Sequence, residues 1–238
     1  LEELGYDGAG HLWLDNLEER IKTLDAHGLR LFQVYLQVNI AADANSPYDP
    51  RLKESLPLLR GRKTMLALLM SGAAPSDPAL DERAVALVQE IADMANEAGV
   101  RVALYPHSGN WLEHVEDGLR IVQKAKRPNV GVMFNLCHWL KVDDEKNLKP
   151  LLTSAMPHLF AVSIHGADRA EEIHAGTGNW IQPLGNGSFD VGALLDTLRE
   201  LGYQGPVGLQ CYGIPGDARD HLTKSMTDWR RLMDARRP

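Results

Sequence analysis

The chain has 238 residues, 44% of them apolar, which is enough for one large α/β domain with a buried core. Its net charge is −7, and this acidic balance disfavours binding to the phosphate backbone of a nucleic acid. No apolar run approaches the roughly 20 residues of a membrane span, and two cysteines are too few for a disulfide framework. We therefore expect one domain over residues 1–238, with neither nucleic acid nor membrane as a partner. The sequence leaves open whether the chain forms a homo-oligomer.

Apolar, strand-like runs alternate with amphipathic helical segments along the whole chain, which is the pattern of a parallel sheet. The expected strands lie near residues 8–13, 31–39, 64–70, 100–107, 130–137, 159–165 and 206–212. The expected helices lie near residues 16–27, 80–98, 111–126, 145–155, 190–201 and 219–235. Asp15 and Asp190 are expected helix N-caps, and Gly28, Gly99 and Gly202 stand where C-cap glycines belong.

The first residues repeat the end of a later helix. Residues 1–8 read Leu-Glu-Glu-Leu-Gly-Tyr-Asp-Gly, and residues 198–205 read Leu-Arg-Glu-Leu-Gly-Tyr-Gln-Gly. By analogy, residues 1–4 form the last turn of a helix, so we expect one strand and most of one helix to be absent from this sequence. Seven strands and the absent one make the eight of a (β/α)8 TIM barrel. A signal peptide could be absent with them, so the sequence does not decide between cytoplasm and export.

A doubly wound sheet is the alternative architecture, but no glycine-rich phosphate loop follows a strand as that fold requires. In a TIM barrel the chemistry lies at the C-terminal ends of the strands. In the stretch 31–39, Gln33, Tyr35, Gln37 and Asn39 alternate with apolar residues and should face the barrel axis, with Gln37 and Asn39 near the mouth. Their amides suit a hydroxyl-rich ligand; the alternative is a polar interior in which they bond to one another.

Four later stretches also end in polar residues. They read Val-Arg-Val-Ala-Leu-Tyr-Pro-His (100–107), Val-Gly-Val-Met-Phe-Asn-Leu-Cys-His-Trp (130–139), Phe-Ala-Val-Ser-Ile-His-Gly-Ala-Asp (160–168) and Gly-Pro-Val-Gly-Leu-Gln-Cys-Tyr-Gly (205–213), and a loop Leu-Gly-Asn-Gly-Ser-Phe-Asp (184–190) precedes the last. This succession resembles the xylose-isomerase-like TIM barrels, a superfamily of sugar-phosphate isomerases and epimerases that includes ketose 3-epimerases. The resemblance covers about residues 1 to 229.

The resemblance implies a divalent-metal site made by Glu, Asp, His and Glu at successive strand ends, with a further His three residues after the Asp. This chain has Tyr105, Asn135, His165 and Gln210 at those four positions, and His138 three residues after Asn135. Three carboxylates are thus replaced by neutral groups. Since Mn²⁺ and Mg²⁺ prefer anionic oxygen ligands, we expect neither to bind in the family manner.

Histidines are the remaining titratable groups at this mouth. A zinc site of His165, His138 and His107 is one reading, which makes zinc the more plausible metal; the other is that they are hydrogen-bonded pocket residues. The candidate catalytic residues are His107, His138 and Tyr105, because amides take up no proton near neutral pH. The candidate binding residues are Gln37, Asn39, Trp111, Asn135, Trp139, His165, Gln210 and Tyr212. Trp111 and Trp139 would stack on a sugar ring, unless each packs against its own helix.

The function expected from these residues is a sugar or keto-sugar isomerase or epimerase, or a lyase, that acts without the usual Mn²⁺ or Mg²⁺. The alternative is a carbohydrate-binding barrel that has kept the pocket and lost the catalysis. In both cases the ligand is a small sugar or polyol. Whether it carries a phosphate stays open, and Lys141 and Arg169, which follow strand ends, could reach one. An apurinic-type nuclease of the same superfamily fits poorly, because the metal-binding carboxylates and a basic face are both wanting.

Overall fold

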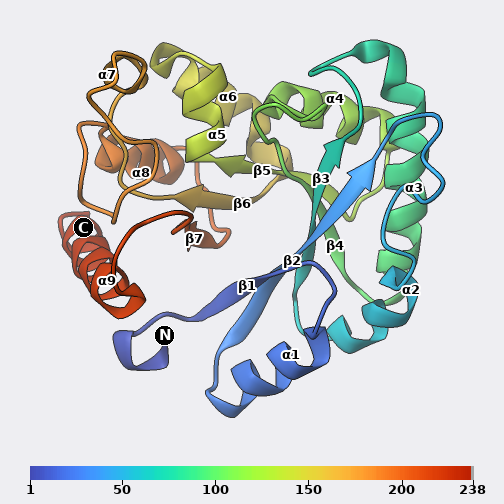
Figure 1. Cartoon of the computed structure of the whole chain (residues 1–238), viewed down its shortest axis with the longest axis horizontal. Coiled ribbons are helices and arrows are strands. Elements are labelled where there is room, and N and C mark those ends of the chain that lie inside the picture. The colour runs from blue at the N-terminus through green and yellow to red at the C-terminus, as the bar shows by residue number, and fades with distance from the viewer. Residues whose placement is uncertain (237–238) are drawn as a thin grey trace.

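The computed structural model describes residues 1–236. Seven parallel strands form a nearly closed ring that is surrounded by helices (Figure 1). The strands are β1 (Gly8–Leu12), β2 (Arg30–Asn39), β3 (Met65–Ser71), β4 (Arg101–Leu104), β5 (Val130–Asn135), β6 (Leu159–Ile164) and β7 (Val207–Leu209). Their spatial order follows the chain, and every neighbouring pair is parallel. This is the expected TIM barrel, but no ladder joins β7 to β1 among the described residues. We call this gap the seam.

The helices lie on the outside of the barrel wall. They are α1 (Leu17–Ala26), α2 (Leu52–Ser55), α3 (Asp81–Glu97), α4 (Val115–Ala125), α5 (Leu136–Val142), α6 (Leu148–Ala155), α7 (Ala170–His174), α8 (Val191–Glu200) and α9 (Ala218–Asp234). Short 3₁₀ turns occur at Glu2–Leu4, Leu56–Leu59, Pro78–Leu80, Glu145–Asn147 and Met156–His158. None of the helices within residues 1–236 combines the length and apolar character needed to cross a bilayer.

All seven expected strands are present, which confirms the alternating pattern. Several boundaries were wrong. The strands expected at 100–107 and 206–212 end at Leu104 and Leu209. Residues 136–142 form α5 rather than the end of a strand, because the Asn135 side chain accepts from the backbone N–H of His138 and starts a helix there. The helix expected from residue 111 begins at Val115, because residues 105–114 form a loop across the barrel mouth. The short helices α2 and α7 were not foreseen.

The expected helix ends are mostly confirmed. Gly28, Gly99 and Gly202 have φ of 63°, 69° and 77°, the left-handed conformation that glycine adopts without steric cost. The Asp190 carboxylate accepts from the backbone N–H of Ala193 at 2.9 Å, as an N-cap does. The N-cap expected at Asp15 was wrong, because Asn16 precedes α1 and Asp15 pairs with an arginine of another loop.

The interior of the barrel is lined by small and flexible side chains. Met65, Ala67, Ala103, Met133 and Ala161 form a cluster beneath the strand ends, separate from the larger core between strands and helices. Because alanines fill little space, a cavity of about 1560 Å³ extends through the barrel and into the seam. The main core is packed from residues such as Val34, Leu36, Leu66, Leu68, Ile91 and Val132, which are at most 2% exposed.

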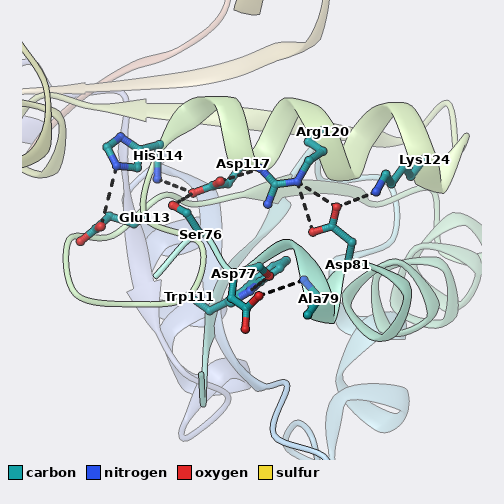
Figure 2. Close-up of polar contacts among 10 residues, drawn as sticks. All are labelled: Ser76, Asp77, Ala79, Asp81, Trp111, Glu113, His114, Asp117, Arg120 and Lys124. Atoms are coloured by element: carbon teal, nitrogen blue, oxygen red, sulfur yellow. Dashed lines mark hydrogen bonds and ion pairs between the residues drawn. The ribbon is translucent and has the colours of Figure 1, made fainter. Parts of the chain in front are cut away.

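A polar network holds α3 against α4 (Figure 2). Asp81, at the start of α3, accepts from Arg120 Nε at 2.9 Å and from Lys124 Nζ at 2.6 Å. Asp117 accepts from Arg120 Nη1 at 2.7 Å and from Ser76 Oγ at 2.7 Å. Burial favours a raised pKa for Asp81, but the bonds from Arg120 and Lys124 outweigh it, so its pKa lies below the usual range.

The same network anchors the loop of residues 105–114. Asp117 accepts from the backbone N–H of His114, and the indole of Trp111 donates to the carbonyl of Asp77 at 2.8 Å. The backbone N–H of Ser76 donates in turn to the carbonyl of Trp111 at 2.9 Å. Figure 2 shows Ser76, Asp77 and Trp111 beside the first half of α4, ahead of the start of α3. The loop that carries His107 is therefore fixed from its outer side.

Candidate active site

Three strand ends meet in one hydrogen-bonded group at the barrel mouth. The side-chain nitrogen of Asn135 donates to the Tyr105 hydroxyl at 2.8 Å and to Gln210 Oε1 at 2.7 Å. The Asn135 oxygen accepts from the backbone N–H of His138 at 3.2 Å. Tyr105 and Asn135 are 5% and 3% exposed. The expectation that the ends of β4, β5 and β7 converge is therefore met, and the amide of Asn135 is already fully engaged.

His165 lies at the end of β6 and is completely buried. Its Nδ1–H donates to the carbonyl of Gly166 at 2.9 Å, which leaves Nε2 as the unprotonated nitrogen. That Nε2 is buried and has no hydrogen-bond partner within residues 1–236. Burial lowers the pKa of His165 to about 4, so the ring is neutral near pH 7.

His107 and His138 stack on each other beside this group. Their ring centroids are 3.8 Å apart and the planes differ by 35°. Nδ1–H of His107 donates to the carbonyl of Ser108 at 3.0 Å, and the Ser108 hydroxyl shares a hydrogen bond of 3.1 Å with His138 Nδ1. Tyr105 meets both rings edge-on. The four side chains form one continuous contact surface.

Burial disfavours a positive charge on either ring of the stacked pair. Burial, followed by repulsion from His107, Lys141 and His165, lowers the pKa of His138 to about 3. Burial is also the main cause that lowers the pKa of His107, with Lys141 contributing. Since charging one ring penalises charging the other, the pair is neutral at physiological pH. His107 is less buried than His138 and is the stronger base of the two.

Strand β2 contributes polar side chains to the interior of the barrel, as its alternation predicts. The Gln33 side chain donates to the Tyr35 hydroxyl, and the Tyr35 ring meets Tyr105 edge-on at 5.4 Å between centroids. Gln37 lines the cavity further up. Burial raises the pKa of Tyr35 to about 12 and that of Tyr105 above its ordinary range, so both hydroxyls stay protonated and can donate.

Three predicted binding residues are placed elsewhere. Trp111 is fully buried in the main core, and Trp139 is 4% exposed and packs against Phe134 and Phe189, so neither ring can stack on a sugar. The reading in which each tryptophan packs locally is the correct one. Asn39 does not line the cavity, and its side-chain oxygen accepts from the backbone N–H of Ala41 at 3.0 Å.

Tyr212 lies just past β7 and borders the cavity. It is 82% exposed, so it stands at the open rim beside the seam. Side-chain alternation along the strand expected at 206–212 would have placed it inside the barrel. The ladder of β7 ends at Leu209, and the alternation does not continue beyond it.

One cavity-lining residue, Trp13, was missed as a candidate, and a second, Lys141, was expected only as a possible contact to a phosphate. Trp13 directly follows β1 with φ of 64° and borders the cavity. The first expected strand, 8–13, has no polar residue at its end that would have marked it. Lys141 lies one turn along α5 from His138 and also lines the cavity. The signal for Lys141 was its spacing, but it could be used only once residues 136–142 are known to be helical.

The donor set does not fit the metal site of related barrels. A hard dication needs anionic oxygens, and Tyr105, Asn135 and Gln210 offer neutral groups that already bond to one another. The histidines of the alternative zinc set are not arranged as a three-ligand group either, because His107 and His138 stack on each other with ring centroids 3.8 Å apart. Within residues 1–236 no group of three or more His, Cys, Asp or Glu side chains is arranged to hold a metal ion.

Comparison with known proteins adds to this geometry. The family model described as "Xylose isomerase-like TIM barrel" matches residues 1–233. A ketose 3-epimerase of Arthrobacter globiformis is 27% identical over 150 residues, which are 62% of this chain and 47% of that protein. The chain thus spans about half the length of this curated relative.

Solved structures share the fold. The structure of an L-ribulose 3-epimerase superposes with a TM-score of 0.77 at 16% identity, and covers 98% of this chain and 86% of its own. A xylose isomerase-like TIM barrel protein from Mycobacterium smegmatis, solved in complex with magnesium, gives a TM-score of 0.72 at 17% identity, with 98% and 85% covered. At such identities these likenesses establish the architecture alone.

Proposed function

Because the chain belongs to the xylose isomerase-like TIM barrel family, we propose that it is a sugar or keto-sugar epimerase or isomerase whose site lies at the barrel mouth and has no fixed carboxylate. The observation that carries the proposal is the hydrogen-bonded group of Tyr105, Asn135 and Gln210 beside the stacked His107 and His138. The curated relative is a ketose 3-epimerase, which supports a ketose or a related sugar as substrate.

The hydrogen-bond directions assign a role to each polar group. The side-chain amide of Asn135 donates one N–H to the Tyr105 hydroxyl oxygen and the other to Gln210 Oε1. The Tyr105 O–H and the Gln210 side-chain N–H groups therefore remain free to donate. A sugar carbonyl placed against these two donors would be polarised, and the negative charge that develops on its oxygen would be stabilised by them. Tyr105 acts here as a proton-bearing donor rather than as a base, because burial keeps its pKa high.

His107 is the base of this mechanism. Its Nδ1–H is held by the carbonyl of Ser108, so Nε2 carries the lone pair that accepts the proton from the carbon next to the carbonyl. The electron pair of that C–H bond moves onto the carbonyl oxygen between Tyr105 and Gln210. Protonation of the former carbonyl carbon, with transfer of the neighbouring hydroxyl proton to the original carbonyl oxygen, completes an aldose–ketose isomerisation. Protonation of the same carbon on its opposite face gives the epimer.

His165 is the second candidate for proton transfer. It follows β6 while His107 follows β4, so the two imidazoles flank β5 and its Asn135 from opposite sides along the sheet. Its Nε2 has no hydrogen-bond partner among the described residues, but the ring is fully buried and does not line the cavity, so proton transfer through it requires a local rearrangement of the mouth. No step of this mechanism runs through a metal ion, because the donor set does not fit one.

The test is deuterium uptake from D₂O into a panel of ketoses and aldoses, followed by NMR. Wild type should exchange one carbon-bound hydrogen, His107→Gln should slow exchange by a factor of about 10² or more, and Tyr105→Phe should slow it by about 10². His27→Gln, at an exposed histidine next to α1, is the matched control and should keep the wild-type rate. Undiminished exchange in His107→Gln would overturn the assignment of the base.

A binding barrel without catalysis is the second candidate. The observation in its favour is that the amide of Asn135, which stands at a metal-ligand position of the family motif, is saturated by protein groups. The same panel decides: sugars that raise the melting temperature but exchange no hydrogen would favour the binding protein over the enzyme.

A further inference from the structure

Helix α5 presents one face to the cavity. Cys137, His138 and Lys141 all line it, and Lys141 follows the other two by four and three residues, the spacings that place side chains on one side of a helix. Three residues advance a helix by about 4.5 Å along its axis. The ammonium of Lys141 therefore belongs to the same mouth as the stacked histidines, about one turn farther out.

The charge of Lys141 has no counter-charge in the structure. Within residues 1–236 it makes no ion pair or hydrogen bond, and its Nζ lies 5.5 Å above the ring centroid of Trp180 in the loop between α7 and α8. Arg169, the other cation expected near this mouth, lies within 4.0 Å of Glu145. Lys141 is thus a positive group left available on the rim.

No carboxylate balances it inside the cavity. Among the described residues that line the cavity, the only acidic side chain is Asp7, and this residue precedes β1 at the opposite end of the barrel from the strand C-termini. The mouth therefore combines neutral amides, phenols and imidazoles with one unpaired cation. The positive potential also reaches the histidines, since Lys141 contributes, after burial, to the lowered pKa of His107.

We propose that the substrate of this site is an anionic sugar derivative whose carboxylate or phosphate is bound by Lys141. The proposal rests on the proposed function, since it assigns the substrate class of the same site. A neutral sugar would leave the ammonium unpaired when it fills the mouth. An anionic one satisfies it and places the charged group about one helical turn from the histidine pair, close to the reacting carbons but not on them.

The experiment compares binding of matched probes by calorimetric titration. The probes are D-fructose, D-fructose 6-phosphate, D-glucuronate and inorganic phosphate. The proteins are wild type, Lys141→Gln, Lys141→Arg and Lys53→Gln, where Lys53 is an exposed lysine on α2 outside the cavity. Melting temperatures of the four proteins show that all are folded.

In wild type at least one anionic sugar should bind about tenfold or more tightly than D-fructose, as expected for a charge-assisted hydrogen bond. Lys141→Gln should remove this preference, while Lys141→Arg and Lys53→Gln retain it. Raising the ionic strength from about 0.02 M to about 0.3 M should weaken the anionic probes only. The tighter of the two anionic sugars tells whether the group is a phosphate or a carboxylate.

The proposal is overturned if no anionic sugar binds more tightly than D-fructose, or if Lys141→Gln keeps the preference. It is also overturned if inorganic phosphate binds as tightly as the sugar phosphate, since the site would then recognise an anion and no sugar. Binding and deuterium exchange are separate readouts. A Lys141-dependent preference without exchange would contradict the proposed catalysis while sustaining the ligand class, and exchange of neutral sugars alone would do the reverse.

Discussion

Two buried imidazoles should make the protein sensitive to mild acid. Burial lowers the pKa of His138 to about 3 and that of His165 to about 4, from an ordinary value of 6.5. The unfolded chain therefore binds more protons than the folded one between about pH 4 and 6.5. The contribution to stability is fully present above pH 6.5, falls as the pH drops below 6.5, and levels off below the folded pKa values.

The magnitude follows from the width of this window. Between pH 6.5 and pH 5 each imidazole is protonated in the unfolded chain but not in the folded one, over about 1.5 pH units at 1.36 kcal/mol per unit. That is about 2 kcal/mol for each ring and about 4 kcal/mol for both. For a fold of ordinary stability, about 5–15 kcal/mol, this is a large share.

The assay is urea unfolding at pH 7 and at pH 5, for wild type and for the double variant His138→Gln/His165→Gln. The free energy of unfolding of wild type should fall by about 4 kcal/mol more than that of the variant. Thr64→Val is the control. It removes a buried hydroxyl that bonds to the carbonyl of Leu31, so it lowers stability without removing an imidazole. An equal fall in wild type and double variant would refute the argument.

Three further changes test other parts of the structure. The triple variant Tyr105→Glu/Asn135→Asp/Gln210→Glu supplies three carboxylates and should bind Mn²⁺ in calorimetry at micromolar or lower concentration, where wild type shows no binding at these residues; a silent triple variant would contradict the view that charge alone keeps the ion out. Trp111→Ala should lower the free energy of unfolding by about 3–5 kcal/mol and leave sugar affinity unchanged, whereas lost affinity at full stability would return this ring to the binding site. Asp81→Asn should cost about 1–3 kcal/mol in urea unfolding and speed amide exchange in residues 105–114, and unaltered exchange there would separate the loop from the α3–α4 network.

The sequence predicted the barrel because its strands keep a regular period and their ends carry polar residues in a recognisable order. It failed at α5 because the apolar residues that follow Asn135 continue a strand-like run. The turn into a helix depends on one side-chain bond from Asn135 to the backbone of His138, which composition does not reveal. The same failure concealed that Lys141 lies on one helix face with His138, because that placement depends on helical spacing.

The sequence identified several residues of the site correctly, but it did not predict the hydrogen bonds among them. The family order located Tyr105, Asn135 and Gln210, but not that Asn135 would donate to both of the others. The tryptophans were misplaced because a ring that follows a strand end can turn toward the axis or toward the helix layer. In Trp111 a bond to the carbonyl of Asp77 and complete burial decide for the helix layer. Neither is visible before two residues that lie 34 positions apart in the sequence are folded together.

The seam gives this barrel an asymmetry that a closed one lacks. Along the free edges of β1 and β7 the peptide groups have no ladder partner among the described residues, so amide hydrogens there should be the least protected of the wall. The cavity reaches this seam and is bordered there by the exposed Tyr212, while α9 and the N-terminal segment are joined across it by the bond from the Tyr6 hydroxyl to the carbonyl of Leu222. Unpaired strand edges of this kind can also pair with strands of another molecule. At high protein concentration we therefore expect intermolecular strand pairing through the edges of β1 and β7.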